Sequence, residues 1–135
     1  MRKTFFIGVL VSSFFLGGCV AVGITALGVG MATGVSHTLS GMVYKTFTST
    51  QANVKRATLG AFHRMQVKVV KSEHKGNTET IHGKAGDRDI EVELEALTPN
   101  TTRMLVTAKK DGGILRDGAT ATEVILQTEK LVGPT

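Results

Sequence analysis

One cysteine and the residues that precede it offer the clearest chemistry in this chain. Cys19 is the only cysteine among 135 residues, and it directly follows Gly18. Arg2 and Lys3 stand at the start of the chain, and an uncharged, apolar run covers residues 5–16. A short positive start, an apolar core and small residues at a cleavage site are the three parts of a secretory signal. The sequence therefore predicts export, with cleavage between Gly18 and Cys19.

The residues Leu-Gly-Gly-Cys at positions 16–19 resemble the lipobox of bacterial lipoproteins. In that family the cysteine thiol is acylated, the chain is cut just before it, and the new amino terminus serves as the anchor. The resemblance implies a covalent diacylglyceryl group and an N-acyl chain on Cys19, and we expect no other cofactor. A lipid also explains a lone cysteine in an exported protein, which otherwise indicates intermolecular pairing or a reactive thiol.

The same resemblance bears on location. One acyl chain anchors a protein only marginally, because each buried methylene contributes about 0.8 kcal/mol, whereas lipoproteins of this type carry two or three chains. An Asp after the lipidated cysteine commonly retains Gram-negative lipoproteins at the inner membrane, but here that residue is Val20. The resemblance thus implies a lipid anchor in the outer membrane, facing the periplasm. The alternative is an uncleaved anchor, since no Lys, Arg, Asp or Glu occurs from Thr4 to Tyr44.

The chain divides into three predicted parts: a signal peptide at 1–18, a lipidated Gly-rich apolar tether at 19–37, and one domain at 38–135. Removing the first 18 of 135 residues leaves 117 and lowers the net charge from +5 to +3. That length suits a single small domain. An exported location makes nucleic acid a poor partner. Gly30 and Gly34 form a small-xxx-small pair, so oligomerisation through the tether is an alternative to a simple tether.

Periodicity predicts an α+β fold with the order strand, helix, four strands, helix. Apolar residues recur at helical spacing after Thr50, whereas strict alternation of apolar residues with Glu91, Glu93 and Glu95 marks a half-buried strand. Ser49 or Thr50 is the expected cap of the first helix, and Asp117 or Thr120 that of the last, where Thr120 and Glu123 also fit a capping box. We expect a two-layer domain with an antiparallel sheet of about five strands and two amphipathic helices on one face. The expected strands are 41–47, 67–71, 78–84, 90–95 and 102–109, and the expected helices are 50–65 and 117–132.

With these elements in place, the chain resembles a family of small bacterial envelope lipoproteins that is catalogued only as a domain of unknown function. The likeness covers roughly residues 41–131. It is strongest in an Ala- and Thr-rich helical stretch at 54–62 and continues through 100–106 and a hinge at 115–118. The family often has Trp where this chain has Lys55. The resemblance implies the fold and the envelope location, and it brings no catalytic residues.

Residues for catalysis or metal binding are sparse. His74 and His82 flank the turn at Gly76, with Glu73 and Glu79 nearby, so a hairpin could gather zinc ligands. We favour exposed polar residues instead, because no close-spaced ligand motif supports a metal. The glutamates of strand 90–95 share one face and do not face each other, and no serine has the context of a nucleophile. We therefore expect neither an enzyme nor a metal protein.

Residues 55–75 carry a local net charge of +5, because six cations are opposed only by Glu73. Such a surface suits anionic headgroups or an acidic partner, or it simply keeps the domain soluble. The candidate docking residues are Lys55, Arg56, Arg64, Lys68, Lys71 and Lys75.

The expected function is that of a non-enzymatic, membrane-anchored accessory or scaffold protein that holds an interaction surface near an envelope partner. The alternative is a periplasmic module that binds a small apolar ligand between the helices and the sheet. The oligomeric state is open. The side chains that would line such an apolar pocket are Phe62, Val92, Leu94, Met104, Val106 and Ile125.

Overall fold

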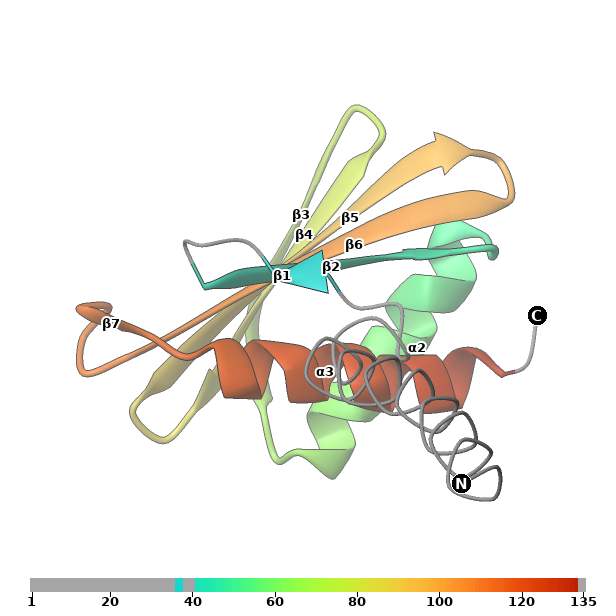
Figure 1. Cartoon of the computed structure of the whole chain (residues 1–135). Helices are drawn as coiled ribbons and strands as arrows, with labels where there is room; N and C mark the ends of the chain where they lie inside the picture. Colours follow the sequence, from blue (N-terminus) through green and yellow to red (C-terminus); the bar gives the residue numbers. More distant parts are fainter. Residues whose placement is uncertain (1–35, 38–40, 134–135) are drawn as a thin grey trace, which may run out of the picture. The chain divides into compact units, whose positions relative to one another are not determined.

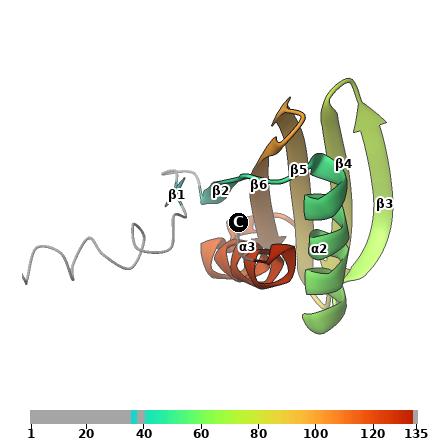
Figure 2. The ribbon, with the colours of Figure 1, turned by 90° about the vertical axis from the view of Figure 1, so that its right-hand side faces the viewer.

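The computed structural model describes residues 36–37 and 41–133, which form an α+β domain (Figure 1). Both helices lie on one face of a single antiparallel sheet (Figure 2). The strand order is β1-β2-β6-β5-β4-β3, and β7 pairs with β6. The elements are β1 (Ser36–His37), β2 (Met42–Phe47), α2 (Gln51–Arg64), β3 (Lys68–Lys75), β4 (Thr78–Ala85), β5 (Arg88–Thr98), β6 (Thr101–Lys110), β7 (Leu115–Arg116) and α3 (Gly118–Val132).

The predicted fold class and the order strand, helix, four strands, helix are confirmed. Two short strands, β1 and β7, add to that order. β1 takes into the sheet two residues that the sequence assigns to the tether. β3 begins at Lys68, later than predicted, because Gln66, with φ of 57°, and Val67 complete the turn out of α2. It also runs further than predicted, to Lys75. The predicted signal peptide, Cys19 and the pair Gly30 and Gly34 lie outside the described residues.

The core lies between the sheet and the two helices. Side chains alternate between the two faces of a strand, and in β5 this buries Ile90, Val92 and Leu94 while the intervening acidic residues stay at least partly exposed. β6 contributes Met104 and Val106 to the same inner face. The opposite face of the sheet, here called the outer face, is covered by neither of the two described helices (Figure 2).

The two helices begin and pack as their sequences predict. Thr50 caps α2 by accepting a hydrogen bond from the Asn53 amide, and Asp117 caps α3 by accepting one from the Thr120 amide. Of the two predicted caps for α3, Asp117 is thus the one used. Thr120 already lies inside the helix, so the predicted capping box between Thr120 and Glu123 does not form.

Two glycines allow the layers to approach closely. A Cβ atom at Gly83 in β4 would stand 2.5 Å from Val67 Cγ1 and 2.7 Å from Phe62 Cε2. A Cβ atom at Gly60 in α2 would stand 2.9 Å from Leu131 Cδ1 of α3. Gly60 weakens the helix by intrinsic propensity, and the contact with Leu131 explains why a small residue is nevertheless used there.

Candidate functional site

The outer face of the sheet is a surface that the described part of the fold leaves uncovered. Antiparallel partners point to the same side, so the register places side chains there in rows across the strands. The central row runs from Tyr44 through Leu105 and Glu93 to Thr80. Tyr44 is 38 % exposed. An aromatic ring, an aliphatic side chain and a carboxylate therefore stand side by side in the middle of an open sheet.

A shallow hollow of about 310 Å³ opens on this row. Tyr44 and Leu105 supply its apolar surface, and Glu93, Glu95 and Arg103 supply its charges. Arg103 is already bound to Glu95. No ion pair joins Glu93 to any residue of the described part of the chain. The hollow thus combines apolar contact area with a carboxylate that is open to a cation from outside.

A second hollow of about 310 Å³ lies on the same face, at the end of the sheet near β7. Its lining includes Val70, His82, Glu91 and Thr107. His82 lies between two carboxylates: its Nε2 is 3.7 Å from a Glu73 oxygen and its Nδ1 is 3.4 Å from a Glu91 oxygen. The outer face therefore contains two concave sites and is not flat.

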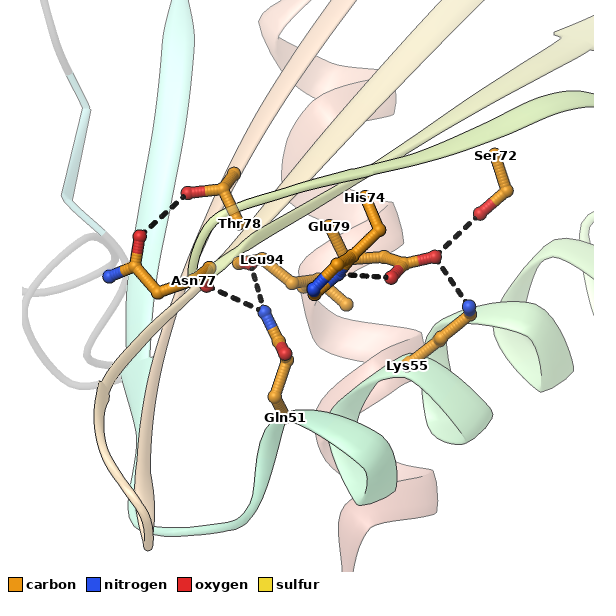
Figure 3. Close-up of polar contacts among 8 residues, drawn as sticks. All are labelled: Gln51, Lys55, Ser72, His74, Asn77, Thr78, Glu79 and Leu94. Carbon is orange, nitrogen blue, oxygen red and sulfur yellow. Dashed lines mark hydrogen bonds and ion pairs between the residues drawn. The ribbon is translucent and has the colours of Figure 1, made fainter.

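On the opposite side of the sheet, Glu79 is the centre of a polar cluster (Figure 3). Glu79 is only 8 % exposed. One carboxylate oxygen accepts hydrogen bonds from Lys55 Nζ of α2 and from Ser72 Oγ at 2.7 Å, and the other lies 3.0 Å from His74 Nδ1. Nearby, Gln51 donates hydrogen bonds to the backbone oxygens of Asn77 and Leu94. These contacts attach α2 to β4, to β5 and to the turn at Asn77, and Glu79 in turn joins β4 to β3.

The same contacts set the charge state of Glu79. The hydrogen bond from Lys55 and the one from Ser72 lower the pKa of Glu79 to about 2, against the opposing effect of burial. Glu79 is therefore ionised at neutral pH. A similar arrangement holds Asp117, whose pKa the hydrogen bonds from Thr120 and Arg88 lower to about 2. A carboxylate with so low a pKa is a poor general base, because it holds protons weakly.

The Glu79 cluster does not have the geometry of a nucleophilic triad. Ser72 and His74 each contact the carboxylate, and no hydrogen bond between the two is found. A nucleophilic serine needs its hydroxyl within hydrogen-bond reach of the base. The cluster instead gives one buried carboxylate three donors, which is an arrangement that holds elements together.

The predicted approach of His74 and His82 does not bring them into one site. His74 pairs with Glu79 and points to the inner face, whereas His82 pairs with Lys71 and points to the outer face. The two imidazoles therefore lie on opposite faces of the sheet, although the turn at Gly76 brings their strands together. Within residues 36–37 and 41–133, no group of three or more His, Cys, Asp or Glu residues is placed to hold a metal ion.

The six cations of the candidate docking surface are divided between two sides of the domain. The helical cations lie on the layer that covers the inner face. The strand cations pair with outer-face residues of β4 and therefore point to the outer face. The helical set is Lys55, Arg56 and Arg64, with Lys55 bound to Glu79, and the strand set is Lys68, Lys71 and Lys75, with Lys71 bound to Glu73.

The side chains predicted to line an apolar pocket all lie in one packed cluster. Each is at most 1 % exposed, and none of them lines either of the two hollows. Their positions in the core are those that the alternation and helical spacing predict. They are Phe62, Val92, Leu94, Met104, Val106 and Ile125.

The sequence did not single out two features of the surface. Tyr44 and Leu105 meet because β2 pairs with β6, which is 60 residues further along the chain, so no local pattern indicates their contact. Ile114, in the turn between β6 and β7, is 82 % exposed, and Leu115, the first residue of β7, is 48 % exposed. An exposed Ile-Leu pair in a glycine-rich turn was a signal available in the sequence, next to Gly112 and Gly113.

Comparison with known proteins gives the chain a family. No curated protein matches the sequence significantly. A model of one protein family matches residues 4–112, a range that contains the apolar run at 5–16, Cys19 and every strand from β1 to β6. This range covers most of the chain, and it agrees with the resemblance drawn from residues 54–62 and 100–106. The chain belongs to the family described as "Protein of unknown function (DUF3568)".

Proposed function

We propose that this protein is a non-enzymatic lipoprotein of the bacterial envelope that is anchored through lipid on Cys19 and presents the outer face of its sheet to another envelope protein. The lipobox-like residues 16–19 support the anchor. The family match supports a shared leader, because it includes residues 4–18. Among the described helices, none is long and apolar enough to cross a bilayer.

The observation that carries the interaction role is the open central row of the outer face. Tyr44 and Leu105 offer apolar area, and Glu93 has no cationic partner among the described residues. Tyrosine is enriched at protein interfaces, and arginine is another residue that often carries much of the binding energy there. A partner that places an Arg or Lys against Glu93, with its aliphatic stem over Leu105, would complete this row.

The anchor is tested by the intact mass of the protein extracted from membranes. We expect the mass of residues 19–135 plus a diacylglyceryl group, with or without an N-acyl chain. Cys19→Ala should remove both the lipid and the cleavage. An unmodified full-length mass for the native protein would contradict the proposal and would mean an uncleaved anchor with a free thiol.

The interaction role is tested by a photo-crosslinking residue placed in living cells at Tyr44 or at Leu59. The two positions are matched, because Tyr44 is 38 % exposed on the outer face and Leu59 is 37 % exposed on α2. We expect a discrete crosslinked product from position 44 and none from position 59. Equal products from both positions, or none from position 44, would contradict an outer-face interface.

The cations of β3 allow a second test of the same interface. Lys68 and Lys71 point to the outer face, so an acidic region of the partner would contact them. Charge reversal to Lys68→Glu and Lys71→Glu should then abolish co-purification of the crosslinked partner. The matched control is reversal of Arg56 and Arg64, which belong to α2. Unchanged co-purification in the strand variant would exclude docking through these lysines.

A further inference from the structure

We propose that the turn between β6 and β7 is a membrane-contact finger that places Ile114 and Leu115 in the interfacial layer of an anionic bilayer. The finger is defined as residues 109–116. The inference rests on the proposed lipid anchor at Cys19, and it adds a second contact that would fix how the domain stands on the membrane.

Exposure of the two apolar side chains is the first observation. Ile114 is 82 % exposed, the highest value among the exposed large hydrophobic side chains of the described residues, and its neighbour Leu115 is 48 % exposed. An isolated exposed apolar residue needs no explanation, but two adjacent exposed aliphatic residues at the end of a turn form a small apolar patch. Burial of such side chains in the interface of a bilayer would remove this area from water.

Charge around the tip is the second observation. Lys109, Lys110 and Arg116 flank the two apolar residues, and Asp111 is the only acidic residue within the finger. Cations beside an apolar tip suit an anionic bilayer, because each cation near the surface is attracted to the headgroups. Apolar residues between basic residues are thus arranged for acidic lipid.

The opposite end of the sheet provides a contrast. Leu97, near the end of β5, is 45 % exposed, but residues 96–102 contain no Lys or Arg. Both ends of the sheet therefore expose an aliphatic side chain. Cations flank it directly in the chain only at the end with β7, because at the other end Lys75 belongs to β3 and Arg103 is bound to Glu95. Charge favours the finger as the end that meets lipid.

The finger is held in a defined conformation. β7 pairs with β6, and the Asp117 amide donates a hydrogen bond to the Ala108 carbonyl at 2.9 Å. Asp111, Gly112 and Gly113 turn the chain with φ values of 54°, 68° and 90°. A Cβ atom at Gly41 would lie 2.9 Å from Arg116 Cβ, so the start of β2 packs against β7. A preorganised tip loses little conformational entropy when it inserts.

The length of chain before β1 permits the contact. Sixteen residues separate Cys19 from Ser36, and this number can span roughly 50 Å when extended. Ser36 pairs with Tyr44, which pairs with Leu105. The five residues from Leu105 to Lys110 cover about 17 Å. An anchor on Cys19 can therefore lie in the same bilayer that the finger contacts.

The absence of tryptophan from the chain allows a direct test. Ile114→Trp and Leu97→Trp each introduce a single fluorophore, at the finger or at the opposite end of the sheet. The lipidated protein extracted from membranes is reconstituted into vesicles of phosphatidylethanolamine and phosphatidylglycerol, with and without brominated lipid. We expect a blue-shifted emission at position 114 that brominated lipid quenches, and a water-like emission at position 97 that it does not.

Three outcomes would overturn the inference, and one of them separates it from the proposed anchor. If the protein floats with the vesicles while the emission at position 114 stays water-like, the membrane contact of the finger is contradicted and the lipid anchor is not. Quenching at position 97 in place of 114 would assign the contact to the other end. Failure to float would contradict the anchor and the inference together.

A second variant tests the charges separately from the apolar tip. In the Ile114→Trp background, Lys109→Gln and Lys110→Gln should each weaken the contact by about fivefold in anionic vesicles, and both should have little effect in phosphatidylcholine. If the lysine variants were quenched as strongly as the Ile114→Trp parent in anionic vesicles, the role given to the cations would be overturned.

Discussion

At the scale of single residues, Glu79 is the side chain on which the polar contacts between α2 and the sheet converge. Its folded pKa of about 2 lies below its usual value of 4.5. A group with a depressed folded pKa stabilises the protein above its unfolded pKa and loses that effect as the pH falls through its folded pKa. Glu79 should therefore stabilise the domain fully above pH about 4.5 and progressively less toward pH 2.

Glu79→Gln should lower the free energy of unfolding at pH 7 by about 1–3 kcal/mol, because it removes a charged acceptor from three donors. The loss of stability between pH 4.5 and pH 2 should become shallower, and Asp117 should account for part of the remainder. Urea denaturation at several pH values measures both effects. The matched control is Glu93→Gln, since Glu93 has no ion pair within the described residues, and an equal effect from this control would contradict the assignment.

Asp117 gives a second prediction at the residue scale. Its carboxylate accepts hydrogen bonds from the Thr120 amide and hydroxyl and from Arg88 Nε at 2.8 Å. Asp117→Ala removes both the cap of α3 and the link to β5, so it should cost about 1–2 kcal/mol or slightly more. Thermal unfolding measures the loss. Asp87→Ala is the control, because Asp87 reaches Arg88 only at 3.7 Å on the surface, and comparable losses would contradict a capping role.

Local pattern identifies Asp117 as one of two candidate caps, but it does not predict the Glu79 cluster. A cap is a relation between neighbours three residues apart, so Asp117 and Thr50 can be found from the sequence. Lys55 and Glu79 are separated by 24 residues and meet only after α2 has packed on the sheet. The sequence places Glu79 beside two histidines, but it does not reveal that only His74 shares its face.

At the scale of elements, the contact between β4 and α2 depends on Gly83. Phe62 is 1 % exposed and Val67 is 7 % exposed, so neither side chain can move away from an added methyl group. Gly83→Ala should destabilise the domain by about 1–3 kcal/mol through overpacking. Chemical denaturation measures this change.

Gly118→Ala is the matched control for Gly83. Gly118 opens α3 and has no heavy atom near the position of an added Cβ. Alanine there should leave stability unchanged or raise it by up to about 1 kcal/mol, because alanine favours the helix. A Gly83 variant as stable as this control would contradict the close approach of β4 and α2.

Helices and strands with strong periodicity can be predicted from the sequence, but the elements that pack or pair with them cannot. Alternation in β5 and helical spacing in α2 and α3 assign each inward face correctly. β3 is exposed along its whole length, and a bulge between Val69 and Lys71 interrupts its register. The cations of β3 therefore point away from those of α2, which charge counting along the chain cannot show.

At the scale of the whole molecule, β3 forms an edge of the sheet within the described fold. β3 pairs with β4 alone among the described strands, so no described strand pairs with the backbone groups of its other edge. Val69 and Val70 are 42 % and 66 % exposed on this edge. Natural sheets protect such edges with lysines and bulges. Three lysines and one bulge occur in β3, so some of the basic charge serves to keep copies of the domain apart.

Neutralising the edge should therefore promote self-association. The variant Lys68→Gln, Lys71→Gln, Lys75→Gln removes three positive charges from β3, and a second copy could then pair with its edge without repulsion between facing lysines. Sedimentation velocity should show concentration-dependent oligomers of the variant. The control removes the same charge from the helices, through Arg56→Gln, Arg64→Gln and Lys130→Gln. Because both variants have the same net charge, a difference between them isolates the edge from general solubility, and identical behaviour would mean that the bulge alone protects β3.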